Sequence, residues 1–92
     1  MKILCLGKTP YLLQLRAQVL ETVGHRVRTG DPMATKAILQ DFFDIVIVSC
    51  EVSGAELDEI ERSVRPGTRV VRLDRLTRPE DLISIVGSIA NF

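Results

Sequence analysis

Residues 44–48 read Asp-Ile-Val-Ile-Val and contain four consecutive β-branched apolar side chains. A run of this kind is typical of a parallel strand that is buried on both faces. Residues 2–6, Lys-Ile-Leu-Cys-Leu, form a second continuous apolar run. The most apolar strands of an open sheet belong at its centre, so we expect these two runs to be the central strands.

Two other β-like runs carry arginines, at residues 25–29 (His-Arg-Val-Arg-Thr) and 68–73 (Thr-Arg-Val-Val-Arg-Leu). Charged side chains protect an exposed strand from pairing with other chains, so both runs are expected at the edges of the sheet. We interpret their arginines as solvated edge residues rather than phosphate ligands. These arginines are Arg26, Arg28, Arg69 and Arg72.

The intervals between the strands have helical patterns. Thr9-Pro10 predicts an N-cap followed by proline in the first turn. Beyond it, positions at helical spacing are Leu12, Leu15 or Arg16, Val19 and Val23, flanked by Leu13 and Leu20, and Gly24 should end this helix.

Three more helices are predicted over residues 33–41, 55–64 and 79–89. The strict alternation of strand and helix indicates βαβ units around a parallel sheet. We therefore predict a single domain over residues 1–92, a three-layer α/β/α fold of the flavodoxin-like class. Its four-stranded parallel sheet should have the order 2-1-3-4.

Composition excludes several classes of function. The net charge is zero and only four residues are aromatic, which argues against a nucleic-acid partner. No apolar run approaches the roughly 18 residues of a membrane span. Two cysteines and the single histidine, His25, make no metal-ligand cluster, so we expect reduced thiols, no metal and a cytoplasmic location.

Gly7-Lys8-Thr9 has the closing letters of a phosphate-binding loop. Such a loop needs a glycine five positions before its Gly-Lys pair, and that position is Lys2, inside the first strand. We therefore interpret the triplet as a turn into a helix. It still lies where a functional crevice is expected, at the carboxyl ends of the central strands. The expected crevice residues are Gly7, Lys8, Thr9, Ser49, Cys50 and Glu51, with Asp74 at the end of the fourth strand.

Three segments together resemble the receiver domain of bacterial two-component response regulators. They are residues 2–10, the passage "ETVGHRVRTG" at 21–30, and "FDIVIVS" at 43–49. The resemblance covers about residues 2–76. It implies the fold predicted above and, in the family, phosphorylation of an aspartate beside a bound Mg²⁺ ion.

The residues that perform this chemistry in the family are replaced here. The acidic pair after the first strand falls on Gly7 and Lys8, and the phospho-acceptor falls on Ser49. The hydroxyl position falls on Asp74, and the family's Lys-Pro resembles Arg78-Pro79. The resemblance therefore implies a non-catalytic signalling module without a cofactor. We also hypothesise that Lys8 forms a salt bridge with Glu51 or Asp74.

A second family is similar around Cys5-Leu-Gly-Lys-Thr9, the cysteine phosphocarriers of the B type in the bacterial sugar phosphotransferase system. The alternative function is therefore a phosphocarrier that uses Cys5 or Cys50. Cys5 should be a buried and inert thiol, because it lies inside a strand. Cys50 lacks a base, because His25 is expected at the opposite end of the sheet.

The receiver's fifth strand has no counterpart here, so the fourth strand is expected at an edge. Either the last helix folds back over this edge or a second chain covers it. We predict a protein partner, either a second copy of this chain or a signalling protein. The possible interface residues are Val70, Leu73, Leu76, Leu82, Ile85 and Ile89.

Overall fold

The computed structural model describes residues 1–32 and 35–90. The elements in chain order are β1 (Lys2–Leu6), α1 (Pro10–Glu21), β2 (Arg26–Gly30), α2 (Thr35–Ile38), β3 (Ile45–Val48), α3 (Gly54–Ser63), β4 (Arg69–Arg72) and α4 (Asp81–Ala90).

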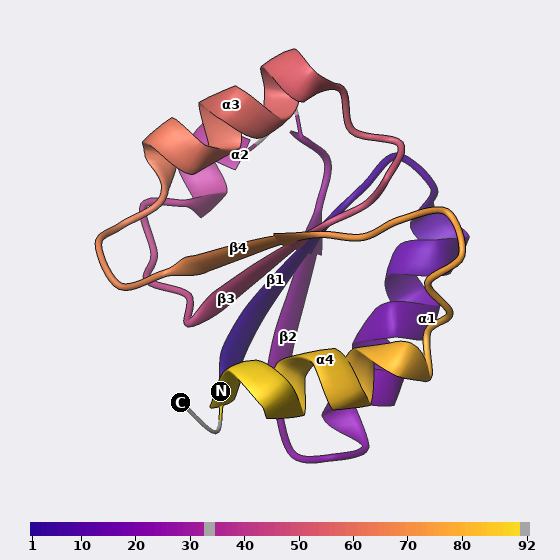
Figure 1. The fold of residues 1–92 in the computed structure, drawn as a ribbon. Helices are drawn as coiled ribbons and strands as arrows, with labels where there is room; N and C mark the ends of the chain where they lie inside the picture. Colours follow the sequence, from indigo (N-terminus) through magenta and orange to yellow (C-terminus); the bar gives the residue numbers. More distant parts are fainter. Residues whose placement is uncertain (33–34, 91–92) are drawn as a thin grey trace.

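The four strands form one parallel sheet in the order β2-β1-β3-β4, which confirms the predicted topology (Figure 1). The two continuous apolar runs are the central strands, and residues 3–6 and 45–48 are fully buried. The two arginine-bearing strands lie at the edges, as expected from their charge. The hydrophobic pattern therefore determined which strands are central.

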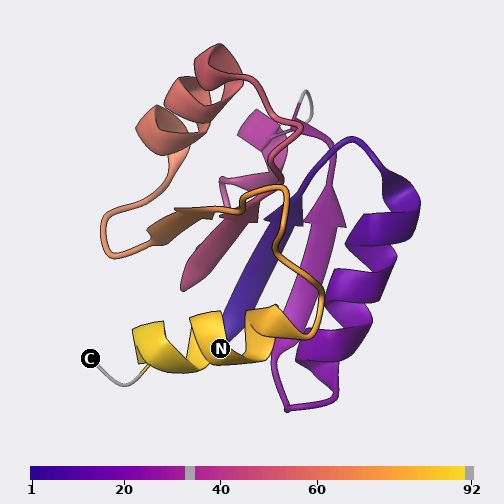
Figure 2. The ribbon, with the colours of Figure 1, turned by 45° about the vertical axis from the view of Figure 1, so that its right-hand side comes forward.

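The helices cover the sheet on both faces. Helices α1 and α4 lie on one face, and α2 and α3 on the other, which gives the three layers that Figures 1 and 2 show. The side chains of β1 alternate between the two resulting cores. Ile3 and Cys5 pack under α1 and α4, whereas Leu4 and Leu6 pack under α2 and α3.

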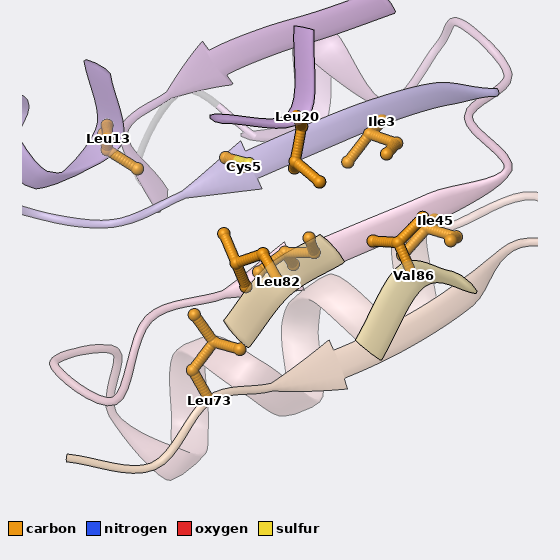
Figure 3. Close-up of a cluster of buried hydrophobic side chains, with 9 residues drawn as sticks. Ile3, Cys5, Leu13, Leu20, Ile45, Leu73, Leu82 and Val86 are labelled. Carbon is orange, nitrogen blue, oxygen red and sulfur yellow. The ribbon is translucent and has the colours of Figure 1, made fainter. Parts of the chain in front are cut away.

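Helix α4 folds back over the chain's own sheet. After β4 the chain crosses to the face on which α1 lies, and Leu82 and Val86 enter the core there (Figure 3). Of the predicted interface residues, Leu73 and Leu82 are therefore buried inside this chain, which corrects their assignment to an intermolecular surface. Val70, Ile85 and Ile89 are half-buried against the cores, and Leu76 is 86% exposed.

Helix α1 begins at Pro10 as predicted, but its buried face differs from the predicted one. Leu13, Arg16, Ala17 and Leu20 point inward, while Val23 is exposed. Apolar residues lie almost all round this helix, so helical spacing alone did not determine which side would be buried. The consequence is a buried arginine, Arg16, at the position of the helical series that the sequence left open between Leu15 and Arg16.

The second predicted helix is shorter than expected. Met33 and Ala34 lie outside the described residues, and α2 ends at Ile38 rather than at Asp41. Leu39 and Phe43 turn inward to the core immediately afterwards, so the chain must leave the helix early. In residues 1–32 and 35–90 no helix has the length and apolar character needed to cross a membrane.

Candidate functional site

The ends of β1 and β3 lie side by side at the carboxyl edge of the sheet. The backbone N–H of Ser49 donates to the carbonyl of Leu6 at 2.9 Å, which holds the two loops together where the strands end. β1 connects to β2 on one side and β3 lies on the other, so this is the point where the strand order reverses. The predicted crevice residues after β1 and β3 are thus brought together.

Gly7 is required by the close approach of these loops. A Cβ atom at this position would lie 3.1 Å from Cβ of Ser49 and 3.2 Å from Cδ2 of Leu13. Both distances are shorter than normal van der Waals contact, so a side chain here would force its neighbours to move. An acidic residue therefore does not fit this position without rearrangement.

Glu51 is the centre of a hydrogen-bond network at this edge. The hydroxyl of Thr9 donates to Oε2 of Glu51 at 2.7 Å, and the buried hydroxyl of Ser49 donates to Oε1 at 3.1 Å. Thr9 occupies the N-cap position of α1, but its side chain makes no capping bond to the helix. Its hydroxyl instead connects the β1 loop to the β3 loop.

The pKa of the Glu51 carboxyl is lowered by this network. The Thr9 hydrogen bond is the largest cause, and Ser49, the Arg16 guanidinium and the backbone of Lys8 act in the same direction. Because the folded-state pKa lies below its unfolded value, Glu51 contributes stability above the unfolded pKa. That contribution is lost as the pH falls through the folded-state pKa.

We predict that Thr9→Val raises the pKa of Glu51, because it removes the strongest hydrogen bond to the carboxylate while keeping the side-chain shape. The pH dependence of the Glu51 carboxyl carbon-13 shift measures this pKa directly. Thr77→Val, which removes a hydroxyl bound to Asp74, is the matched control and should leave it unchanged. If the pKa of Glu51 were the same in Thr9→Val as in the wild type, the hydrogen bond from Thr9 to Glu51 would be contradicted.

Lys8 has a different partner from the two that were predicted. Its Nζ lies 2.9 Å from Oε1 of Glu56, near the start of α3, so neither Glu51 nor Asp74 is its salt-bridge partner. The Lys8 hydrogen bond is the main reason that the pKa of Glu56 is lowered. Glu56 is placed there by a capping box in which Ser53 and Glu56 bind each other's backbone. The spacing Ser-x-x-Glu before α3 was the sequence signal for this geometry.

Arg16 is the residue of the site that sequence analysis missed. It is 7% exposed, so most of its side chain is covered by the fold. Its charge nevertheless acts on both the Cys5 thiol and the Glu51 carboxyl. A fixed positive charge therefore lies close to the network at the carboxyl edge.

The two cysteines are in different environments. Cys5 is 1% exposed, and its burial raises the pKa of the thiol to about 12, partly offset by Arg16. Cys50 is half-exposed and lines a hollow of about 400 Å³ together with Arg72, Asp74 and Arg75. His25 lies at the other end of the sheet, where its Nδ1 is 3.2 Å from the N-terminal nitrogen, so it cannot serve Cys50 as a base.

One thiol per folded chain should react with a disulfide reagent at pH 8, and both should react in urea. Burial keeps Cys5 protonated and inaccessible, whereas Cys50 is open to solvent. The absorbance of the thiolate released from the reagent gives the number of reactive cysteines. In the folded Cys50→Ser variant we expect no released thiolate. Rapid reaction of Cys5 in the folded Cys50→Ser variant would contradict the packing of β1.

Asp74 and Arg78 do not join the network around Glu51. Oδ1 of Asp74 accepts from the backbone N–H of Leu76 at 2.8 Å and from the hydroxyl of Thr77 at 3.1 Å. Arg78 donates its backbone N–H to Asp81 at the start of α4, at 2.9 Å, and its side chain is exposed. Both residues shape the connection between β4 and α4.

Among the described residues, no three His, Cys, Asp or Glu side chains gather as metal ligands. Compared with models of known protein families and with curated proteins, the sequence matches none of them. The site must therefore be interpreted from its own chemistry.

Proposed function

We propose that this chain is a non-catalytic, receiver-like interaction module of the cytoplasm that does not undergo aspartyl phosphorylation. The observation that carries the proposal is the set of residues at the carboxyl edge, where Gly7, Lys8 and Ser49 stand in place of the family's acids. A side chain at Gly7 would require Ser49 and Leu13 to shift. Lys8 is ion-paired with Glu56. The acceptor position is Ser49, which is fully buried.

A phosphorylation assay tests this proposal. The folded chain is incubated with acetyl phosphate and Mg²⁺, and its intact mass is measured; we expect no added phosphoryl group. An adduct on a carboxylate would overturn the proposal. An adduct that is lost in Cys50→Ser would instead favour the phosphocarrier alternative, for which the hollow with two arginines beside Cys50 is the supporting feature. Cys5 is excluded from that role by its burial.

The partner we propose is a second copy of the chain, paired along β4. This strand is an edge of the sheet, so its backbone groups on the side away from β3 are available for pairing. A two-fold axis at Val71 places Val70 opposite Arg72 of the other copy and keeps arginines from lying directly opposite each other. An axis between Val70 and Val71 would place Arg69 opposite Arg72, and this like-charge pair is unfavourable.

Size-exclusion chromatography with light scattering measures the oligomeric state. We expect a dimer at micromolar concentration. Val70→Pro should dissociate it, because residues 69 and 73 donate their N–H groups toward β3 and the N–H of Val70 between them points to the outer edge, where proline removes the donor. Val27→Pro is the matched control, since the N–H of Val27 points outward at the opposite edge in the same way. A monomeric wild-type chain at micromolar concentration would overturn self-association, and a dimer unaffected by Val70→Pro would overturn its placement on β4.

A further inference from the structure

We propose that the groove between α1 and β2 binds an extended peptide as an additional strand of the sheet, with an apolar side chain in the groove and a basic side chain at Glu21. The inference deepens the proposed interaction function, on which it rests. It uses the edge of the sheet opposite β4, so it is tested separately from pairing along β4.

The outer edge of β2 presents backbone groups that can pair with another strand. In the described part of the chain, no strand pairs with β2 on the side away from β1. The N–H of Arg26 and the carbonyl of Gly30 bond toward the β1 side of the sheet. Because the direction of these groups alternates along a strand, the N–H and carbonyl groups of Val27 and Thr29 point outward. An extended peptide can bind to such an edge through main-chain hydrogen bonds.

A groove runs beside this edge, and the side chains of the same two residues, Val27 and Thr29, line it. Its other wall is α1, which lies alongside β2 (Figure 2) and contributes Leu13 and Ala17 as apolar contacts. The groove has a volume of about 540 Å³. Clefts of about 300–1,000 Å³ are typical of ligand sites. Since side chains alternate between the faces of a strand, every second side chain of an added strand would point into the groove.

The arginines of β2 do not obstruct the groove. Arg26 and Arg28 alternate with the two groove-lining residues of the strand, so their side chains lie on the opposite face of the sheet. There the guanidinium of Arg28 lies 3.6 Å from the carboxylate of Asp41. The charges of this edge strand are therefore on one face only, and the other face is open to apolar contact.

Glu21 gives the groove a charge that selects the peptide. It is the last residue of α1, and no lysine or arginine of the described residues forms an ion pair with it. The other charged residues of the lining, Lys8 and Asp31, already have partners. A lysine or arginine of the peptide is the complementary group. Because side chains two positions apart share a face of a strand, we expect a basic residue two positions from an apolar one.

The test is a titration with a synthetic peptide, Thr-Lys-Thr-Leu-Thr-Lys-Thr with both ends blocked, which presents lysine and leucine on one face in either strand direction. We expect saturable shifts of the backbone amides of Ala17, Val27 and Thr29. Val27→Pro removes an outward donor and should lower the affinity at least fivefold, whereas Val70→Pro on the opposite edge should leave it unchanged. Circular dichroism checks that both variants fold. Absence of saturable shifts in the wild type, or equal affinities of the two folded proline variants, would overturn the proposal.

An exchange of charges tests the role of Glu21 at an exposed position, where folding is not at risk. A peptide with glutamate in place of both lysines should bind the wild type about threefold more weakly, and Glu21→Lys should reverse this preference. Glu61→Lys is the matched control, because it makes the same charge change on α3 and should keep the wild-type preference. An unreversed preference in Glu21→Lys would overturn the charge contact.

Two further results would identify a different occupant of the groove. If lysine amide bound as tightly as the peptide, the groove would be a small-molecule site and strand addition would be overturned. If Val27→Pro dissociated the dimer in light scattering, a second copy of the chain would occupy this edge instead of a peptide. A dimer that persists in Val27→Pro while peptide binding is lost would support the peptide site and keep it separate from β4.

Discussion

Replacing Phe43 with alanine should lower the free energy of unfolding by about 3–5 kcal/mol, because it removes the largest fully buried side chain of the core. The ring is 1% exposed, and packs with Val46, Val48 and Ile60 under α2 and α3. A small domain has a total stability of about 5–15 kcal/mol, so this one substitution should remove a large part of it. Urea denaturation followed by circular dichroism measures the change.

Phe42 provides the matched control, since it is the same residue type one position earlier. Its side chain is 42% exposed, so Phe42→Ala should change stability by about 1 kcal/mol or less. Similar losses in the two variants would show that the loop before β3 is not placed as described. The conservative variant Phe43→Leu should keep most of the apolar contact and lose less than Phe43→Ala.

Leu82→Ala should lower the free energy of unfolding by about 2–5 kcal/mol. Leu82 is fully buried where α4 crosses the sheet, in the core that also contains Leu20 and Leu73 (Figure 3). The substitution would leave a cavity between α4 and the sheet, and this helix is what covers that part of the sheet. The same urea measurement applies.

Ile83 lies on the same helix and is 41% exposed. Ile83→Ala should therefore have a much smaller effect than Leu82→Ala, although it removes a similar number of carbon atoms. A larger loss of stability in Ile83→Ala than in Leu82→Ala would show that α4 buries a different face from the one described. If neither substitution changed the free energy of unfolding, α4 would not be packed on the sheet of its own chain.

The order of the strands could be predicted from sequence because it depends on a simple contrast. Residues 45–48 and 3–6 are apolar throughout, whereas the runs around Val27 and Val70 are interrupted by arginines. Continuous apolar runs must be buried on both faces, and charged runs must reach solvent. The start of α1 was equally local, since proline at position 10 fits only the first turn, whereas α4 begins at Asp81 and not at Pro79 as predicted.

The candidate site was predicted in position but not in its contacts. The topology alone brings Thr9, Ser49 and Glu51 to one edge, because parallel strands end together. The partner of Lys8 could not be read from the sequence. Glu56, Glu51 and Asp74 are all acids near that edge, and the choice depends on how α3 approaches the β1 loop.

The sequence by itself determined the alternation of strands and helices, the central pair of strands and the edge at which the two loops meet. These features follow from hydrophobic periodicity and turn chemistry, which act over a few residues. Only the tertiary structure decided that Phe43 rather than Phe42 is buried, that Arg16 lies inside, and that Glu51 is held by Thr9 and Ser49. Each of these depends on the packing of segments far apart in the chain. Phe42 and Phe43, for example, are adjacent and of the same type, so the local sequence pattern does not show which of them is buried.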